Sequence, residues 1–393
     1  MNVEEKGWGL RVFEKGVGFA SGTGEVNWAL AEKLSKLNKR PEIELPNECS
    51  RKKVDVLDQK LDSSFLEDFS EIFVSLLSDS PIVPTFSKLR LYDMKSHLSN
   101  SEGLDLEKRE KIFRFETSLK IEDKGEVGEV FLVKWSRRPV GETEISDMIE
   151  GIEKCIGARP PESSLCDVIL SPQLVCDALW PVLTYQASGE ALYTGKSLFS
   201  EGESVAHPKL SIKDDGTYPY GILSSPFDGE GVGCRDVFLI KRGEFAGRIN
   251  DLLYGKLTGL GSSGNGVRQA RLGGPDNAYQ VPPSLSGSNL VVEPGKKSLK
   301  KMIEETEKGV LVEECAWLNP DNFTGAFGSE IRKGFLIENG ELGRPIKGGN
   351  LSGNVLEMIK RVGGVGKESE ITSGHTLAAV SPYVKFEKLK VSA

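Results

Sequence analysis

The chain has 393 residues, which at roughly 100 to 200 residues per domain suggests two or three domains, and 38% of them are hydrophobic, enough for buried cores. Its 58 acidic and 50 basic side chains leave a formal net charge of −8, the wrong sign for a protein that coats nucleic acid. The N-terminus lacks the apolar run of a signal peptide, and no stretch approaches the roughly 18 apolar residues of a membrane span. We therefore expect a cytoplasmic protein that binds neither nucleic acid nor membranes.

Two amphipathic helices are predicted in the first part of the chain. The first helix places four apolar side chains on one face: Val26, Leu30, Leu34 and Leu37. The second helix follows a Ser64-x-x-Glu67 capping box and presents another four: Leu66, Phe69, Phe73 and Leu76. We expect both helices to pack these faces against a sheet.

A β-hairpin is predicted next. Its first strand alternates polar residues with one face made of Phe113, Phe115, Thr117, Leu119 and Ile121. Phe131, Val133 and Trp135 repeat the alternation after the turn residues 122–125. A helix near residues 144–156 then ends at Arg159-Pro160-Pro161, which is typical of a linker. The sequence thus predicts an N-terminal α+β domain over residues 1–158, with helices on an antiparallel sheet.

The remainder is rich in glycine, since 32 of the 44 glycines follow residue 160. Short strands separated by turn residues predominate in it, and three helices are expected near residues 173–187, 298–307 and 353–362. Residues 238–244 and 335–341 resemble each other, each a strand entering a tight turn, and Asn339-Gly340 favours a type I′ turn. The pattern predicts an α+β fold, with a mostly antiparallel, β-rich C-terminal domain over residues 159–393.

Two glycine motifs resemble nucleotide-binding loops only in part. Residues 259–264 match G-x-G-x-x-G, but the glycines and proline at 273–275 prevent the long helix that a dinucleotide site needs. Residues 363–367 lack the first glycine and the hydroxyl residue of a phosphate loop and are expected to form a helix C-cap and turn. We therefore expect no nucleotide site.

Acidic and glycine-flanked residues after position 213 either line a binding cleft or form turns between strands. Asp214 and Asp215 are adjacent, so their carboxylates point to opposite faces of an extended chain and cannot share a proton. The segment 264–266, with Arg268, could form a nest of N–H groups for a carboxylate or phosphate. The cleft-lining candidates are Asp215, Asp228, Glu230, Gly264, Asn265, Arg268 and His375.

The predicted helix at 173–187 begins with a Ser171-Pro172 cap. Pro181 lies inside its apolar pattern, where it removes a hydrogen bond and costs about 3 kcal/mol or more unless the fold already bends there. Cys176 and Asp177 flank the apolar face, either as potential ligands or as a packed thiol and a local cap. The six cysteines include no C-x-x-C pair, so we expect reduced thiols.

Seven segments after residue 165 occur in the order found in a known family: 167–172, 214–216, 227–231, 263–268, 323–327, 337–341 and 349–353. Residues 9–13 and 18–20 are similar to the opening hairpin of the same family. The chain therefore resembles the TldD/PmbA family, once called modulators of DNA gyrase.

This resemblance implies a zinc-dependent peptidase system whose TldD-type subunits carry HExxxH on the helix after the strand and a cysteine ligand near the C-terminus. On that pattern Cys176 and Pro181 occupy the histidine positions, Asp177 the glutamate position and Ser373 the cysteine position, two residues before His375. A catalytic zinc needs three protein ligands, and only Cys176 could still coordinate. The chain thus resembles the PmbA/TldE side of the family, which lacks the metal site and pairs with a TldD-type catalytic subunit.

Three functions follow as hypotheses. The first is a non-catalytic subunit that shapes the cleft of a zinc-bearing, TldD-type partner acting on unfolded peptides, with no cofactor in this chain. The second is an autonomous metallopeptidase with a site rebuilt from Cys176, Asp177, His207 and His375. The third is a scaffold without a peptidase partner that binds extended peptides. Family members usually form two-subunit assemblies, so we expect a dimer, including a possible homodimer of the chain alone.

Overall fold

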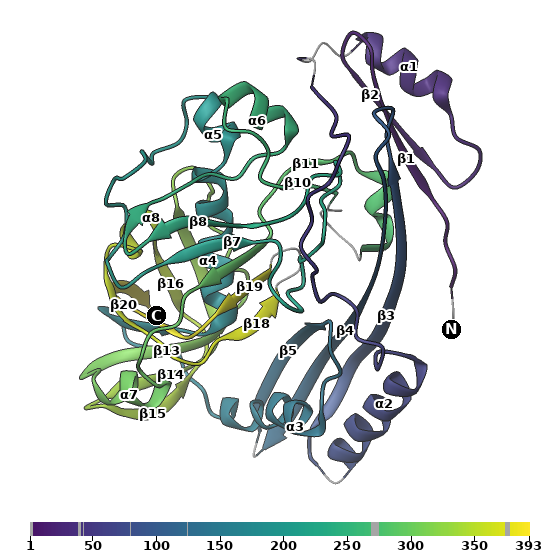
Figure 1. The fold of residues 1–393 in the computed structure, drawn as a ribbon. Coiled ribbons are helices and arrows are strands. Elements are labelled where there is room, and N and C mark those ends of the chain that lie inside the picture. Colours follow the sequence, from purple (N-terminus) through teal and green to yellow (C-terminus); the bar gives the residue numbers. More distant parts are fainter. Residues whose placement is uncertain are drawn as a thin grey trace.

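The computed structural model describes residues 3–37, 41, 43–78, 80–123, 125–268, 275–373 and 378–393. It confirms the predicted α+β fold, with a smaller sheet and its helices beside a larger, β-rich region (Figure 1). The two largest hydrophobic clusters draw on residues 61–156 and 166–391, and the predicted division after residue 158 stays a prediction. Within the described ranges, no helix is both long and apolar enough to cross a bilayer.

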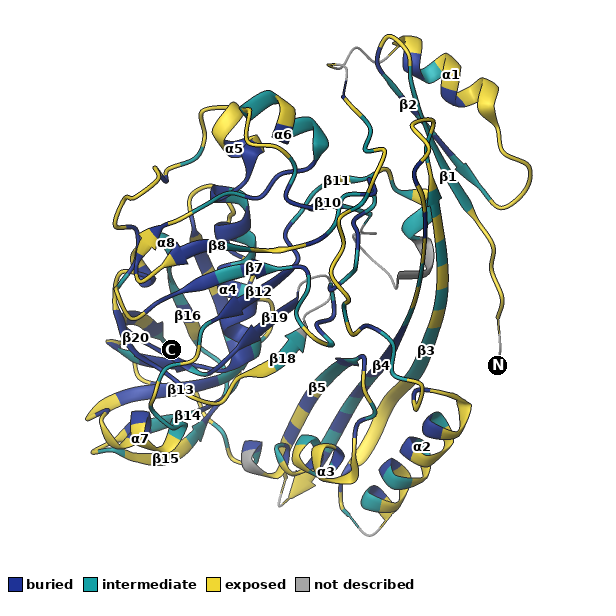
Figure 2. Ribbon diagram, viewed as in Figure 1, coloured by how far each residue is buried: buried dark blue, intermediate teal, exposed yellow. Residues whose placement is uncertain are grey.

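The N-terminal hairpin pairs β1 (Trp8–Phe13) with β2 (Val17–Gly22), and α1 (Trp28–Leu37) packs on it. The prediction of the packed face of α1 was wrong: Ala31 and Ser35 are buried, whereas Leu30 and Leu37 are 43% and 72% exposed (Figure 2). The reason is a close approach of backbones, because a Cβ atom on Gly18 would lie 1.8 Å from the carbonyl oxygen of Ala31. Only small side chains fit between elements at that distance.

The helix α2 (Ser63–Ser78) lies on a sheet of three antiparallel strands, β3 (Val83–Ser99), β4 (Asp105–Asp123) and β5 (Glu126–Ser136). The N-terminus of α2 is capped by Asp62, whose Oδ1 accepts the N–H of Phe65 at 3.0 Å, and not by the predicted box at Ser64. Its buried side chains are Phe65, Phe69, Phe73 and Leu77. Three of these phenylalanine rings stack edge-on or tilted against the rings of β4, so aromatic packing sets the face.

The predicted hairpin of β4 and β5 is confirmed, and its two faces have different neighbours. Phe113 and Phe115 on β4 pack under α2 and α3 (Glu142–Glu150), which is followed by the short helix η1 (Glu153–Cys155). Trp135 on β5 pairs in register with Arg114 of β4, so both lie on the face of the sheet opposite to Phe113 and Phe115. It packs with Ile222 and residues of the C-terminal region, so this face of the sheet joins the two regions.

Two sheets make up most of the C-terminal region. The seven-stranded sheet runs β13-β6-β20-β16-β14-β15, with β17 paired to β20; its strands are β6 (Ser164–Leu170), β13 (Lys308–Cys315), β14 (Ala326–Glu338), β15 (Glu341–Ile346), β16 (Asn350–Asn354), β17 (Val362–Val365) and β20 (Val384–Ser392). The six-stranded sheet runs β18-β19-β12-β7-β8-β9; its strands are β7 (Ile212–Asp215), β8 (Asp236–Lys241), β9 (Glu244–Phe245), β12 (Asn289–Val292), β18 (Glu370–Ser373) and β19 (Ala378–Ser381). Among the described strands, β6–β13 and β12–β19 are the only parallel pairs, and β10 (Gly266–Val267) and β11 (Ser284–Leu285) form a small antiparallel pair.

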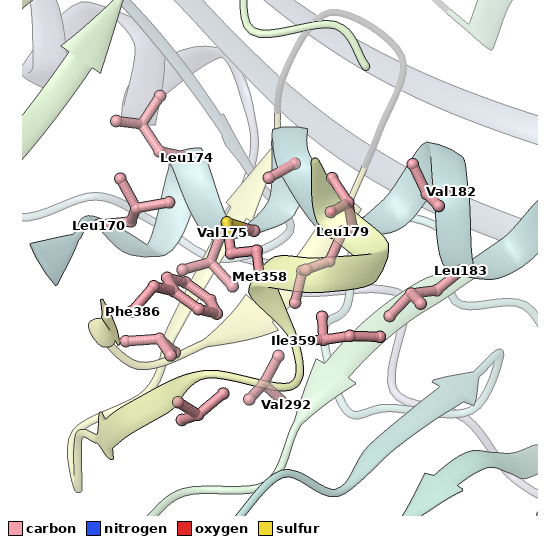
Figure 3. Packing of buried hydrophobic residues seen from close by; sticks show 14 of the residues in the cluster. Leu170, Leu174, Val175, Leu179, Val182, Leu183, Val292, Met358, Ile359 and Phe386 are labelled. Carbon is pink, nitrogen blue, oxygen red and sulfur yellow. The ribbon is translucent and has the colours of Figure 1, made fainter. Parts of the chain in front are cut away.

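The helix α4 (Pro172–Gln186) follows β6 and packs against strands of both large sheets. Its N-terminus is capped as predicted, since Oγ of Ser171 accepts the N–H of Leu174. Leu174, Val175 and Leu179 belong to one hydrophobic cluster with Phe386 and with residues of α8 (Val355–Met358) (Figure 3). The helix continues past Pro181 to its end, so the proline does not terminate it.

Both predicted tight turns are present. The pairs Arg242-Gly243, between β8 and β9, and Asn339-Gly340, between β14 and β15, have positive φ at both residues, as a type I′ turn requires. Residues 363–365, predicted as a C-cap and turn, instead lie in the buried strand β17, because a partner strand is available in β20. The other helices of this region are short: α5 (Gly189–Tyr193), α6 (Leu252–Thr258), η2 (Pro275–Gln280) and α7 (Leu299–Glu304).

Candidate functional site

Cys176, at the first ligand position, lies in the core of the C-terminal region. Its side chain is 0% exposed and belongs to the hydrophobic cluster around α4. Burial, followed by the charge of Asp177, raises the pKa of its thiol well above the usual value. Because the thiolate is the form that binds metal ions, this sulfur is poorly suited to be a ligand.

Asp177 lies on the outer side of the same helix and is partly buried. Its Oδ1 accepts a hydrogen bond of 2.8 Å from Nε2 of Gln173, one turn earlier, and the hydroxyl of Thr372 in β18 donates to Oε1 of Gln173. Burial raises the pKa of Asp177 to about 7, and the bond from Gln173 opposes the shift. A short polar chain from Thr372 through Gln173 to Asp177 thus ties α4 to β18, the strand that ends at Ser373.

Pro181 lies one turn after Asp177 and borders a surface pocket of about 660 Å³. The other lining residues come from the segment after β13 and the start of β14: Asn319, Pro320, Asp321, Asn322, Ala326, Phe327 and Gly328. The pocket therefore opens at the position where the family pattern has its second histidine. Proline supplies no side-chain donor to it.

The C-terminal ligand position lies at the edge of the described chain. Ser373 is the last residue of β18, and His375 lies outside the described residues. His207 is used locally: its Nδ1 accepts the N–H of Lys209 at 3.1 Å, and its own N–H donates to the carbonyl of Ile359. No three His, Cys, Asp or Glu residues of the described chain gather closely enough to hold a metal ion. The donor set at these positions does not fit a catalytic zinc.

Of the adjacent acids in β7, Asp214 is buried and Asp215 faces a turn, as the alternation predicts. Asp214 accepts bonds from the N–H and hydroxyl of Ser288, at 2.6 and 2.8 Å, and from Nδ2 of Asn265 at 2.8 Å. Burial raises its pKa to about 6, against these hydrogen bonds. Asp215 accepts the N–H and hydroxyl of Thr217, both at 2.8 Å. Asp214 is therefore an anchor for the loop that carries Asn265.

Asp228 bonds to the glycine segment 264–266, for which the sequence suggested a nest of N–H groups. Its Oδ2 accepts the N–H of Gly266 at 2.8 Å, and its Oδ1 accepts the N–H groups of Glu230 and Val232 at 2.9 and 3.0 Å. Burial and the charge of Glu230 raise its pKa to about 7, while these N–H groups lower it. The protein's own carboxylate thus takes the N–H of Gly266, and Oγ of Ser262 takes the N–H of Gly264 at 3.2 Å, so neither group is available to an external anion.

Glu230 and Arg268 lie where the N-terminal hairpin meets the C-terminal region. Glu230 accepts Nη1 of Arg11 at 2.7 Å and the N–H of Leu252 at 2.8 Å. Arg268 donates to the carbonyl of Val281 at 3.0 Å, and its guanidinium lies over the ring of Phe19. Burial lowers the pKa of Arg268 to about 10. This part of the candidate set forms a buried junction.

The sequence placed Asp228 and Glu230 in one segment and Asn265 and Arg268 in another. The structure joins the two segments through the bond from the N–H of Gly266 to Asp228, and the lining of a cleft by these residues stays a prediction. Sequence reasoning missed the pocket and the bond between Gln173 and Asp177. The i, i+4 spacing of the latter pair is a usable signal for a helix-surface contact. The pocket has no such signal, because its walls come from α4 and from a loop about 140 residues later.

The chain is similar in sequence to a family of metallopeptidases. The family model described as PmbA/TldA metallopeptidase C-terminal domain matches residues 163–393. A protein named Metalloprotease from Methanothermobacter thermautotrophicus is 30% identical over 223 residues, which are 56% of this chain and 47% of that protein. The Metalloprotease TldD homolog of Haemophilus influenzae is 29% identical over 213 residues, 51% of this chain and 42% of that one. The matched region thus spans about half the length of these curated relatives or less.

Nearly the whole length of this chain has the fold of a solved protein. The crystal structure of TldE from Thermococcus kodakarensis superimposes with a TM-score of 0.84, covering 96% of this chain and 88% of that one. The sequences are 22% identical, so this likeness establishes the shared fold.

Proposed function

Because this chain belongs to the PmbA/TldD metallopeptidase family, we propose that it is a TldE-like subunit without its own metal site, which pairs with a TldD-type subunit. In this proposal the pair is a cytoplasmic dimer, the partner carries the zinc ion, and the substrate is an unfolded peptide. The present chain supplies part of the walls of the shared cleft.

The burial of Cys176 carries the proposal. A catalytic zinc requires three protein ligands and an open position for water. The cysteine is 0% exposed with its thiol held protonated, and Pro181 has no donor atom. Neither position can be converted to a ligand by a small movement, since one belongs to the core and the other lacks the chemistry.

The retained surface around Asp177 supports a role in forming a cleft. The bonds among Asp177, Gln173 and Thr372 hold α4 against β18. The pocket beside Pro181 remains open to solvent on the same helix.

The proposal is tested by expressing the chain alone, a TldD-type partner alone, and both together. Zinc content and cleavage of an unfolded casein-type substrate are then measured for each sample. We expect the chain alone to hold no stoichiometric zinc and to cleave nothing, and the mixture to exceed the partner alone. A mutant partner whose HExxxH glutamate is replaced by glutamine is the control and abolishes activity in the mixture. Stoichiometric zinc with cleavage by this chain alone would contradict the proposal.

A further inference from the structure

The pocket beside Pro181 has the size and surroundings of a binding site. Its volume of about 660 Å³ falls within the range of roughly 300 to 1,000 Å³ typical of ligand pockets. That volume exceeds the volume of one side chain. Ala326 and Gly328 of β14 are both exposed along one wall, although the carbonyl of Ala326 already accepts the N–H of Asp321 at 3.0 Å. An extended chain can therefore lie along this wall beside Gly328.

The charge of the pocket selects for cations. Asp321 is the one ionisable side chain among its eight lining residues. The N–H and hydroxyl of Thr324 both donate to Oδ1 of Asp321, at 2.6 and 2.7 Å, and they lower the pKa of Asp321. This carboxylate is thus ionised throughout the neutral range. No lysine or arginine of the described chain lies within ion-pair distance of it.

A second acid strengthens the negative potential. The pKa of Tyr185, on the last turn of α4, is raised by burial and then by the charges of Glu190 and Asp321. Both carboxylates therefore lie close enough to Tyr185 to act on its hydroxyl. Within the described chain, Glu190 also has no ion-pair partner.

Two aromatic side chains flank the lining segment. Trp317 precedes it and is 61% exposed, and Phe323 follows it and is 43% exposed. Aromatic faces attract ammonium and guanidinium groups, and they also cover the alkyl stems of lysine and arginine. Exposed aromatics beside an ionised acid are thus suited to long cationic side chains.

From this geometry we infer that the pocket binds a lysine or arginine side chain of an extended, unfolded peptide. The inference rests on the proposed function, which makes an unfolded peptide the substrate. Asp321 supplies the charge, the exposed Phe323 next to the lining residue Asn322 covers the alkyl stem, and the start of β14 lies along the neighbouring peptide backbone. The pocket thereby gives the assembly a preference for basic residues.

The test uses the isolated full chain and fluorescently labelled, flexible peptides of glycine, serine and alanine with one central lysine, glutamine or glutamate. Binding is followed by fluorescence anisotropy at low and high salt. We expect the lysine peptide to bind about threefold more tightly than the glutamine peptide, because an ion pair with an exposed carboxylate contributes modestly in water, and we expect salt to reduce the difference. Asp321→Asn removes most of this preference.

Glu341→Gln is the matched control, because it removes one exposed acid from β15, outside the pocket, and leaves the preference intact. Phe323→Leu is a second variant that keeps Asp321 and its turn, and it weakens lysine-peptide binding several-fold while circular dichroism confirms folding. Equal binding of the three peptides by the unaltered chain would overturn the inference. Unchanged peptide binding in Asp321→Asn, combined with loss of assembly with the TldD-type subunit, would also overturn it and assign the pocket to the subunit interface.

The two proposals fail in different ways. Binding is measured without the partner, so an inactive mixture of subunits refutes the proposed function and leaves a lysine preference standing. An active mixture whose chain shows no lysine preference refutes the pocket assignment alone.

Discussion

Nη1 of Arg11 donates a 2.7 Å hydrogen bond to Oε1 of Glu230, and the two side chains are 12% and 2% exposed. This pair joins the N-terminal hairpin to the C-terminal region. The other oxygen of Glu230 accepts the N–H of Leu252 at 2.8 Å, so the carboxylate is satisfied on both sides. Removing one member of such a buried pair leaves an uncompensated charge, which is more costly than losing the bond itself.

Arg11→Met is therefore expected to lower the free energy of unfolding by about 3–5 kcal/mol, since methionine keeps the alkyl stem and removes the charge. The measurement is urea unfolding followed by fluorescence, with hydrogen exchange of the β1 and β2 amides. Lys95→Met is the control, because Lys95 and Glu107 are 67% and 57% exposed and such a pair contributes less than about 1 kcal/mol. Equal losses in both variants would contradict the role assigned to Arg11.

Asp177→Asn tests the raised pKa of the carboxyl on α4. The folded-state pKa of about 7 exceeds the ordinary value of 3.8, so the folded protein holds the proton more tightly than the unfolded chain. The stabilisation is complete below about pH 4 and is lost as the pH rises through 7. Asparagine retains the acceptor for Gln173 and cannot titrate. We expect the free energy of unfolding of the unaltered protein to fall, relative to the variant, between pH 4 and 7.

Asp214 and Asp228, with pKa values of about 6 and 7, make the free energy of unfolding depend on pH equally in both proteins. The measured quantity is therefore the difference between the free energies of unfolding of the two proteins, obtained by urea unfolding at steps of half a pH unit. Parallel curves for the two proteins across this range would show that Asp177 titrates normally.

Cys176→Ala separates a structural thiol from a functional one. The thiol is fully buried, so the native protein should react with a thiol reagent at this position only after unfolding. The substitution should cost about 1 kcal/mol of stability through the small cavity that it leaves. Metal content and the activity of the mixed subunits should not change. A loss of bound zinc in the variant would instead support a rebuilt metal site.

Two glycines in the same loop separate the cost of a strained backbone conformation from the cost of a steric clash. Gly264 and Gly261 have φ of +81° and +74°, so both conformations disfavour other residues. A Cβ on Gly264 would lie 2.6 Å from the carbonyl oxygen of Gly233, whereas a Cβ on Gly261 meets nothing within 4 Å. Gly261→Ala should cost about 1–2 kcal/mol, and Gly264→Ala clearly more. Thermal unfolding of both variants measures the difference, and equal costs would exclude a steric role for Gly264.

Substitutions in α1 test which of its faces is packed. Ala31→Leu should destabilise the hairpin by about 1–3 kcal/mol through overpacking, because the backbone of β2 is in close contact there. Leu30→Ala removes an exposed side chain and should change stability by less than about 0.5 kcal/mol. Urea unfolding checks both, and the reverse order would restore the face expected from sequence periodicity.

Local chemistry made several features predictable. The Asn339-Gly340 turn follows from the tolerance of both residues for positive φ, and the alternation around Phe113 and Phe115 follows from the two-residue repeat of a strand. The cap at Ser171 and the helix after it were also visible, because a hydroxyl before proline satisfies the first free N–H groups. Each of these depends on residues within one or two turns of each other.

Features that depend on neighbouring elements were not predictable in this way. The buried face of α1 is set by the close approach of Gly18, and residues 363–365 became a strand because β20 was free to pair with them. The bonds of Asp214 join residues from three segments, and the pocket beside Pro181 joins α4 to a distant loop. Sequence alone therefore determined the family, the fold class and the loss of the two histidines at positions 176 and 181. Only the tertiary structure decided that Cys176 faces the core and that Asp321 lies beside Pro181, because burial and electrostatic potential arise from atoms that approach through space.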